Sequence, residues 1–179
     1  LILGQGDTIK NKKNINNIKE YIYKFRPSVI SININYNIPK ELIDYYVSSS
    51  EMRMFVDHHL YSKLDKTIIV PLNKFKKISK KTKSLDILDF GSKIINDKFI
   101  CKKNYVILPN NQSFAYALGL SIIGNAKNIV LAGFDGYSSG HIKQNEMERV
   151  FKLFYKKYPK NKVFSLTKTS YPVKIKNIR

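Results

Sequence analysis

The sequence predicts an α/β fold of the Rossmann-like kind, a three-layer sandwich in which helices cover both faces of a mostly parallel sheet. Three observations support this prediction. Short apolar strand-like runs alternate with segments in which apolar residues recur at helical spacing. The strand-like runs are apolar almost throughout, as is typical of parallel strands buried on both faces. Several of them lead into turns rich in glycine or asparagine, where such sheets bind ligands.

The first half of the chain supplies two of the expected helices. Ile15, Ile18 and Ile22 recur at helical spacing, and their helix stops before Pro27, because the residue before a proline avoids helical geometry. Residues 51–60 are the second expected helix. Strands are expected over residues 1–3, 28–34, 44–48 and 67–70.

The second half continues the alternation. Residues 112–123 carry small and apolar side chains on most sides, which predicts a buried helix. Met147, Val150 and Phe154 mark one face of an amphipathic helix. The lysine-rich residues 74–103 show no pattern that assigns them. Strands are expected over residues 106–108, 128–132 and 163–166.

The formal net charge of +19 raises the question of nucleic-acid binding, because clustered cations release counterions when they bind phosphates. The excess is mostly scattered lysine, however, and arginine, which binds bases and phosphates in a bidentate manner, is scarce. Even the densest group, residues 74–83, is typical of a solvated surface. We therefore expect no nucleic-acid partner, whereas an anionic small ligand or peripheral contact with an anionic membrane face stays open.

Several features indicate a cytoplasmic location. No apolar run approaches the roughly 18 residues of a membrane span. Cys101 is the only cysteine, which excludes an internal disulfide and fits a reducing compartment.

No Cys/His cluster has metal-ligand spacing, so we expect no metal centre. The length of 179 residues fits one domain. Because the sequence opens directly on a strand, we expect residues 1–179 to be the C-terminal part of a longer chain.

The first candidate ligand loop is the turn after the first strand, which contains Gly4, Gln5, Gly6, Asp7 and Thr8. Its two glycines let the backbone turn tightly and approach a ligand closely. The helix that follows offers unpaired N–H groups and a positive dipole end to a phosphate or carboxylate. The turn lacks the third glycine of the dinucleotide fingerprint, which disfavours classical NAD binding. It also lacks the Gly-Lys pair of NTP-binding loops, which disfavours a Walker-type NTPase. The alternative is a structural turn whose helix cap is Asp7 or Thr8.

Small polar residues follow two more of the expected strands. Strand alternation places Asn33 and Asn35 on one face, where their amides would bind a base or ribose through paired donors and acceptors. Ordinary turn asparagines are the alternative, because asparagine is abundant throughout the chain. Ser113 begins the buried helix, where it either caps the helix or cradles a phosphate.

The loop after residues 128–132 has the largest number of candidate groups. Gly133 opens it, and Asp135 is a candidate to accept hydrogen bonds from sugar hydroxyls or to hold a metal with the phosphates of the ligand. Tyr137 and Ser138 are candidates to donate to a phosphate. The alternative is that Asp135 only caps the turn by accepting backbone N–H groups.

Three histidines are candidates for the general base that would activate a hydroxyl group, a role that most often falls to histidine. His141 lies in the same loop, on the ligand-binding edge, so His141 and Asp135 are the candidate catalytic residues. His58 and His59 lie on the second expected helix, where at least one of them faces solvent.

Two segments resemble a Rossmann-like group of enzymes. Gly4-Gln5-Gly6-Asp7-Thr8 after a strand is similar to the G-x-G-P/D-S/T opening of that group. Residues 124–135 are similar to its G-x-K-x-I-x-L-x-G-x-D segment. The group contains the bacterial family-42 sialyltransferases, the motility-associated-factor glycosyltransferases that modify flagellin, and the MptE-like 6-hydroxymethylpterin diphosphokinases.

A closer resemblance is to the Rossmann-like C-terminal domain of HMG-CoA-lyase-like aldolases of bacterial surface-glycan clusters. That domain has Asp-Tyr near its third strand, a late Leu-Ala-Gly-Phe-Asp-Gly-Tyr and a closing Leu-Thr-x-Thr-x-Tyr. This chain carries these patterns at Asp44-Tyr45 and at residues 131–137 and 166–171. The resemblance covers nearly the whole chain and implies an aldolase barrel upstream of it.

The resemblance also implies roles for individual residues. In the sialyltransferases, the first glycine-rich turn and an asparagine after the second strand hold the cytidine monophosphate (CMP) part of a CMP-sugar. These roles fall on residues 4–6 and on Asn33 or Asn35. A serine at the start of the late buried helix corresponds to Gln112 or Ser113. The catalytic histidine and phosphate-binding tyrosines lie in a lid beyond the late aspartate, where this chain has a much shorter segment.

We therefore expect a sialyltransferase-like glycosyltransferase domain that binds a nucleotide-activated, CMP-linked sugar and a glycan acceptor in bacterial surface-glycan biosynthesis. A non-catalytic binding or assembly domain attached to an aldolase and an MptE-like pterin diphosphokinase are the alternatives. Only the diphosphokinase would need Mg²⁺ and several carboxylates near the phosphates, and the chain has just 13 acidic residues. We expect a cytoplasmic location, with the inner face of the membrane and a homo-oligomer left open.

Overall fold

A parallel sheet forms the centre of the structure. The computed structural model describes residues 1–79 and 84–176. In this part of the chain the sheet has eight strands in the order β11-β10-β9-β1-β2-β3-β4-β5, and every neighbouring pair is parallel. The strands are β1 (Ile2–Leu3), β2 (Ile30–Ile32), β3 (Tyr45–Val47), β4 (Thr67–Val70), β5 (Ile87–Asp89), β9 (Asn128–Ala132), β10 (Lys162–Ser165) and β11 (Lys174–Ile175).

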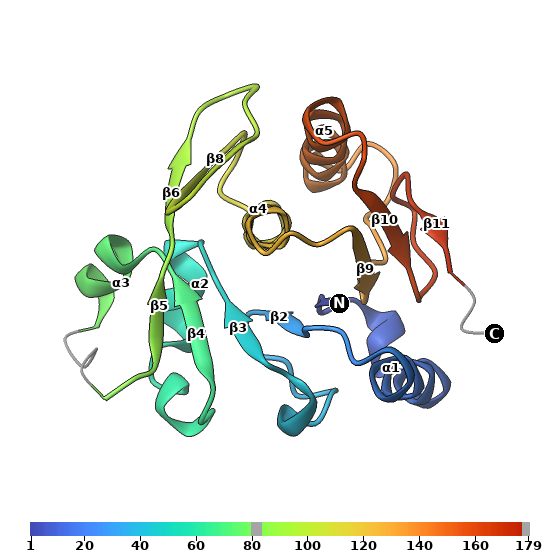
Figure 1. Ribbon diagram of the computed structural model, residues 1–179, viewed down its shortest axis with the longest axis horizontal. Helices are drawn as coiled ribbons and strands as arrows, with labels where there is room; N and C mark the ends of the chain where they lie inside the picture. Colours follow the sequence, from blue (N-terminus) through green and yellow to red (C-terminus); the bar gives the residue numbers. More distant parts are fainter. Residues whose placement is uncertain (80–83, 177–179) are drawn as a thin grey trace.

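Helices cover both faces of this sheet (Figure 1). They are α1 (Lys12–Phe25), α2 (Glu51–Asp57), α3 (Leu72–Ile78), α4 (Ser113–Ile123) and α5 (Ile142–Lys157). The first three pack on one face, and α4 and α5 pack on the other. Because successive strand side chains point to opposite faces, Ile2 joins the core under α4 and α5 and Leu3 joins the core under α1. The structure thus confirms the predicted α/β Rossmann-like sandwich.

A second, smaller sheet lies against α4. It contains β6 (Gly91–Ile94), β7 (Ile100–Lys102) and β8 (Tyr105–Leu108) in the order β6-β8-β7, with β7 antiparallel to β8. Apart from β8, its strands come from the lysine-rich residues that the sequence left unassigned. Of the lysines at positions 74–83, Lys74, Lys76 and Lys77 belong to α3, and the others, Lys80, Lys81 and Lys83, lie outside the described residues.

Helix α4 lies between the large sheet and the small one (Figure 1). Residues 113–119 of this helix are buried, as its apolar sequence predicts. The helix approaches β8 so closely that a Cβ on Gly119 would lie 2.8 Å from Val106 Cγ2. Tyr116, which is fully buried, donates its hydroxyl proton to the Phe90 carbonyl. These contacts hold α4 against the small sheet and the β5–β6 connection.

The strand order reverses between β1 and β9. From β1 the chain runs outward through β2, β3, β4 and β5, and β9 then pairs with the opposite side of β1. The turns that follow β1 and β9 therefore lead away in different directions, which opens a crevice at the carboxyl ends of the strands. The two turns stay joined at their base, because Gly4 N–H donates to the Ala132 carbonyl and Gly6 N–H donates to the Gly133 carbonyl, both at 2.8 Å.

The second strand and the second helix differ most in length from their predictions, and both are shorter in the structure. The strand expected over residues 28–34 ends at Ile32, because Asn33 adopts a left-handed conformation with φ of 55° that leaves the extended strand. The helix expected over residues 51–60 ends at Asp57. Leu60 N–H donates to the Asp57 carbonyl in the turn that follows.

Substitution of Gly119 by alanine tests the close packing of α4 on β8. The added methyl group must displace Val106, so we expect Gly119→Ala to lower the free energy of unfolding by about 1–3 kcal/mol in urea denaturation. Gly124→Ala is the matched control, because a Cβ there meets nothing closer than the Leu120 carbonyl at 3.4 Å. A Gly119→Ala protein as stable as the Gly124→Ala protein would contradict this packing.

Candidate functional site

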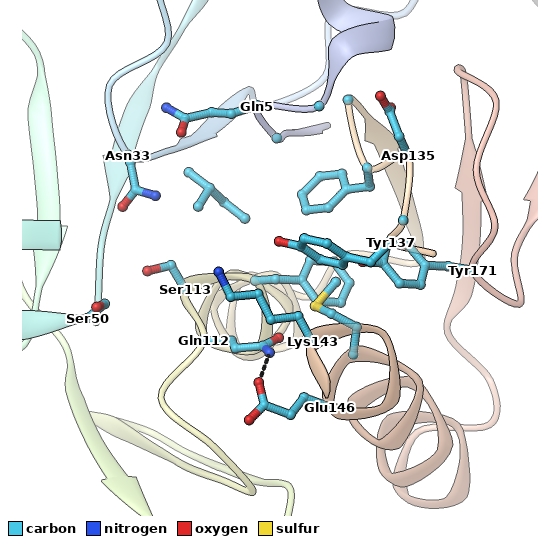
Figure 2. A pocket seen from close by; sticks show the side chains of 18 of the residues that line it. Gln5, Asn33, Ser50, Gln112, Ser113, Asp135, Tyr137, Lys143, Glu146 and Tyr171 are labelled. Carbon is cyan, nitrogen blue, oxygen red and sulfur yellow. Dashed lines mark hydrogen bonds between the residues drawn. The ribbon is translucent and has the colours of Figure 1, made fainter. Parts of the chain in front are cut away.

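A cavity of about 640 Å³ opens in the crevice between β1 and β9. Its walls come from the turns after β1 and β9, the end of β2, and the first turns of α2, α4 and α5. Figure 2 shows Gln5 and Asp135 on one side of it and the start of α4, with Ser113, on the other. Its volume lies within the range of ordinary small-molecule sites.

The turn after β1 forms one wall, and both of its glycines lie close to the turn after β9. A Cβ on Gly4 would lie 2.4 Å from the Gly133 carbonyl oxygen, and a Cβ on Gly6 would lie 2.6 Å from Asp135 Cγ. The contact at Gly4 is with the backbone, so that position needs glycine. The contact at Gly6 is with the end of the Asp135 side chain, which a Cβ would displace from its hydrogen bond to the Thr8 N–H. Gln5 and Asp7 of the same turn also line the cavity, and Asp7 forms an exposed ion pair with Lys10 at 2.7 Å.

Asp135 lines the cavity and also caps the turn opposite it. Its carboxylate accepts the Thr8 N–H at 2.8 Å and the Thr8 hydroxyl. Thr8 itself lies outside the cavity lining. The capping role that the sequence left as the alternative for Asp135 is therefore present in the structure, and a ligand role for its carboxylate stays a prediction.

Asn33 and Asn35 do not share a face, contrary to the expectation from strand alternation. The left-handed Asn33 lines the cavity, and its Oδ1 is buried without a partner among the described residues. Asn35 is buried behind the turn after β1, where its Nδ2 donates to the Gly4 carbonyl at 2.9 Å and its Oδ1 accepts the Asn37 N–H. Asn33 is therefore placed to meet a ligand, whereas Asn35 supports the turn.

The first turn of α4 is open toward the cavity. The N-cap residue Gln112 makes no side-chain cap hydrogen bond: its Nε2 donates to Glu146 Oε2 at 2.8 Å (Figure 2), and its Oε1 is buried without a partner among the described residues. Ser113 Oγ accepts the Ser49 N–H at 3.1 Å, so its own proton is available to a ligand. The first N–H groups of a helix have no intrahelical acceptor, and with the helix dipole they form a binding site for anions.

Tyr137, Ser138 and His141 lie on the outer side of the cavity. Tyr137 lines it, and its N–H donates to Gln144 Oε1 at 2.9 Å. His141 is the N-cap of α5: its Nδ1 accepts the Lys143 N–H at 3.1 Å, and its ring stacks on that of Tyr137 with the centroids 4.8 Å apart. His141 and Ser138 are exposed and lie outside the lining, so His141 meets the cavity only through its contact with the Tyr137 ring.

The other two histidines lie away from the cavity. His58 follows the last residue of α2, where its Nδ1 lies 2.6 Å from the Phe55 carbonyl oxygen, and His59 is exposed in the turn after it. Neither lines the cavity.

The cavity contains groups that the sequence did not single out. Arg53 and Lys143 add positive charge, and Tyr171 adds a buried phenol. Burial raises the pKa of the Tyr171 phenol, and the nearby Tyr137, Glu148 and Asp135 raise it further, so it remains a hydrogen-bond donor at neutral pH. Helical spacing could have indicated Lys143, because it lies on the same face of α5 as Met147 and Val150.

Residues 1–79 and 84–176 contain no group of three or more His, Cys, Asp or Glu side chains placed to hold a metal ion. In the same residues, no helix has the length and apolar character needed to cross a bilayer. Comparison of the chain with protein-family models, with curated proteins and with solved structures finds no match. The resemblance to the sialyltransferase group stays a prediction, and function must be inferred from the cavity.

A double-mutant cycle tests the link between the two turns. Asp135→Ala leaves the Thr8 N–H and hydroxyl without their acceptor, so we expect a loss of about 1–3 kcal/mol in the free energy of unfolding. Thr8→Val should lower the free energy of unfolding by less than Asp135→Ala does. The loss in the double variant should be smaller than the sum of the two single losses by about 0.5 kcal/mol or more. Exposed Ser138→Ala is the control, with an expected change within about 0.5 kcal/mol. Strict additivity in urea denaturation would contradict the coupling.

Proposed function

We propose that this chain binds a nucleotide-activated sugar, CMP-linked, as a sialyltransferase-like glycosyltransferase domain of bacterial surface-glycan biosynthesis. The observation that carries the proposal is the open first turn of α4, which faces the glycine-rich turn after β1 across the cavity. A helix start beside a turn that permits close backbone approach is suited to a phosphate group. The motif resemblance of residues 4–8 and 124–135 supports the same ligand class.

The cavity offers separate partners for the parts of such a ligand. The phosphate would lie on the N–H groups at the start of α4 and accept the proton of the Ser113 hydroxyl, with Lys143 nearby as a cation. Asn33 and Gln5 carry amides at the opposite wall for the base or ribose. A mononucleotide joined to one sugar suits a cavity of about 640 Å³.

Transfer would proceed by attack of an acceptor hydroxyl oxygen on the anomeric carbon of the sugar. The bond from that carbon to the phosphate oxygen breaks, and CMP leaves with the electron pair. The charge that develops on the leaving phosphate is stabilised by the N–H groups of α4 and by Ser113. We assign the acceptor proton to Asp135, because it lines the cavity and His141 does not. The glycan acceptor would enter from the cytoplasm or from the inner membrane face.

Binding without transfer is the second candidate function. Asp135 and His141 both accept capping hydrogen bonds, Asp135 from the Thr8 N–H and His141 from the Lys143 N–H at the start of α5. A domain of this kind would hold the nucleotide-sugar for an attached aldolase.

Calorimetric titration with CMP, CDP, ATP and CMP-linked sugars tests the proposal. We expect CMP and CMP-sugars to bind, and Ser113→Ala to weaken CMP binding about tenfold through loss of one hydrogen bond to a charged group. Ser121→Ala is the matched control on the same helix, because its hydroxyl donates to the Ala117 carbonyl within α4.

The outcomes separate the candidate functions. Release of CMP from a CMP-sugar in the presence of a glycan acceptor, reduced in Asp135→Ala, would support transfer. Tight binding without release would favour the non-catalytic domain. No binding of any nucleotide by the unmodified protein would refute the proposal.

A further inference from the structure

Arg53 connects the cavity to a buried carboxylate. Its Nε lies 3.2 Å from Asp57 Oδ2, one turn further along α2, at ion-pair distance but outside hydrogen-bond geometry. Its Nη2 donates to Gln5 Oε1 at 3.3 Å, in the turn after β1. The guanidinium is therefore held from two elements while it lines the cavity.

Asp57 is a buried acid in a chain of net charge +19. The exposed fraction of its side chain is 6%, against 39% for that of Arg53. The Tyr61 hydroxyl lies near both: burial raises the pKa of this phenol, the Asp57 carboxylate raises it further, and the Arg53 guanidinium lowers it. Because a buried carboxylate without a counter-charge is costly, Asp57 holds the guanidinium in place.

An ordinary surface ion pair would not account for this arrangement. In such a pair both side chains are solvated and the cation has no fixed direction. Here the carboxylate is buried, and Gln5 is itself fixed because its Nε2 donates to the Ile34 carbonyl. A guanidinium has five N–H donors, so contacts to one carboxylate and one amide leave donors for a ligand.

We propose that Arg53, positioned by Asp57 and Gln5, forms an anion subsite of the cavity that binds a phosphate or carboxylate group of the ligand. This inference rests on the nucleotide-sugar function proposed above, because a CMP-linked acidic sugar carries both kinds of group. The planar guanidinium binds either group through two parallel hydrogen bonds. A lysine at position 53 keeps the charge but loses this geometry.

The test compares the affinities of variants for cytidine and for CMP by calorimetry. Arg53→Gln should weaken CMP binding tenfold or more and leave cytidine binding unchanged, since only CMP carries the anion. Arg53→Lys should fall between Arg53→Gln and the unmodified protein. Asp57→Asn should also reduce the preference for CMP over cytidine, because it leaves the guanidinium unanchored. The ratio of the two affinities does not change if a variant merely lowers the folded fraction.

Arg149→Gln is the matched control, because Arg149 forms an exposed ion pair with Asp97 outside the cavity. This variant should bind cytidine and CMP as the unmodified protein does. If Arg53→Gln binds CMP normally but loses affinity for a CMP-linked acidic sugar, the anion is the sugar carboxylate and the subsite stands. If it binds both normally, the subsite is refuted.

A separate probe distinguishes failure of this inference from failure of the proposed function. If the unmodified protein binds no nucleotide, the nucleotide-sugar function fails, and inorganic pyrophosphate is then tested in thermal unfolding. Protection of the unmodified and Arg149→Gln proteins but not of Arg53→Gln would still support the subsite. Equal protection of all three, or protection of none, would overturn it.

Discussion

The close approach of the turns after β1 and β9 is the constraint on which the cavity depends. Gly4 and Gly133 meet where the strand order reverses, and the 2.4 Å between the Gly133 oxygen and a Cβ built on Gly4 leaves no room for any side chain. Two backbone hydrogen bonds join the turns at this point. Beyond it they separate, so the space between them can be reached from solvent while its base stays rigid.

Polar residues around the cavity divide into those that hold its shape and those that face its interior. Asn35 and Thr8 belong to the first group, because their side chains donate to the Gly4 carbonyl and to the Asp135 carboxylate, which are parts of the turns themselves. Asn33 and Ser113 belong to the second, because both line the cavity and the Asn33 Oδ1 and the Ser113 hydroxyl proton are available to a ligand. Asp135 belongs to both groups. The first group lets the second be positioned before a ligand arrives, which reduces the entropic cost of binding.

The features that the sequence predicts well are those with a single physical cause. The parallel sheet follows from continuous apolar strands, the burial of α4 from a helix without a polar face, and the turns at Gly4 and Gly133 from glycines placed directly after strands. The small sheet could not be predicted, because β6 and β7 are partly exposed, lysine-bearing strands without clear alternation. The role of Arg53 could not be predicted for a related reason, since only the structure shows that Asp57 is buried beside it.

Chemical-shift mapping of backbone amides during a CMP titration tests whether the cavity is the nucleotide site, because it reports the location of binding as well as its strength. We expect the largest shifts at the amides of Ser113 and Phe114 at the start of α4, and at those of Gly4 and Gly6 across the cavity. Large shifts confined to another surface, such as the amino ends of β3 and β4 near Asp44 and Asp65, would contradict it.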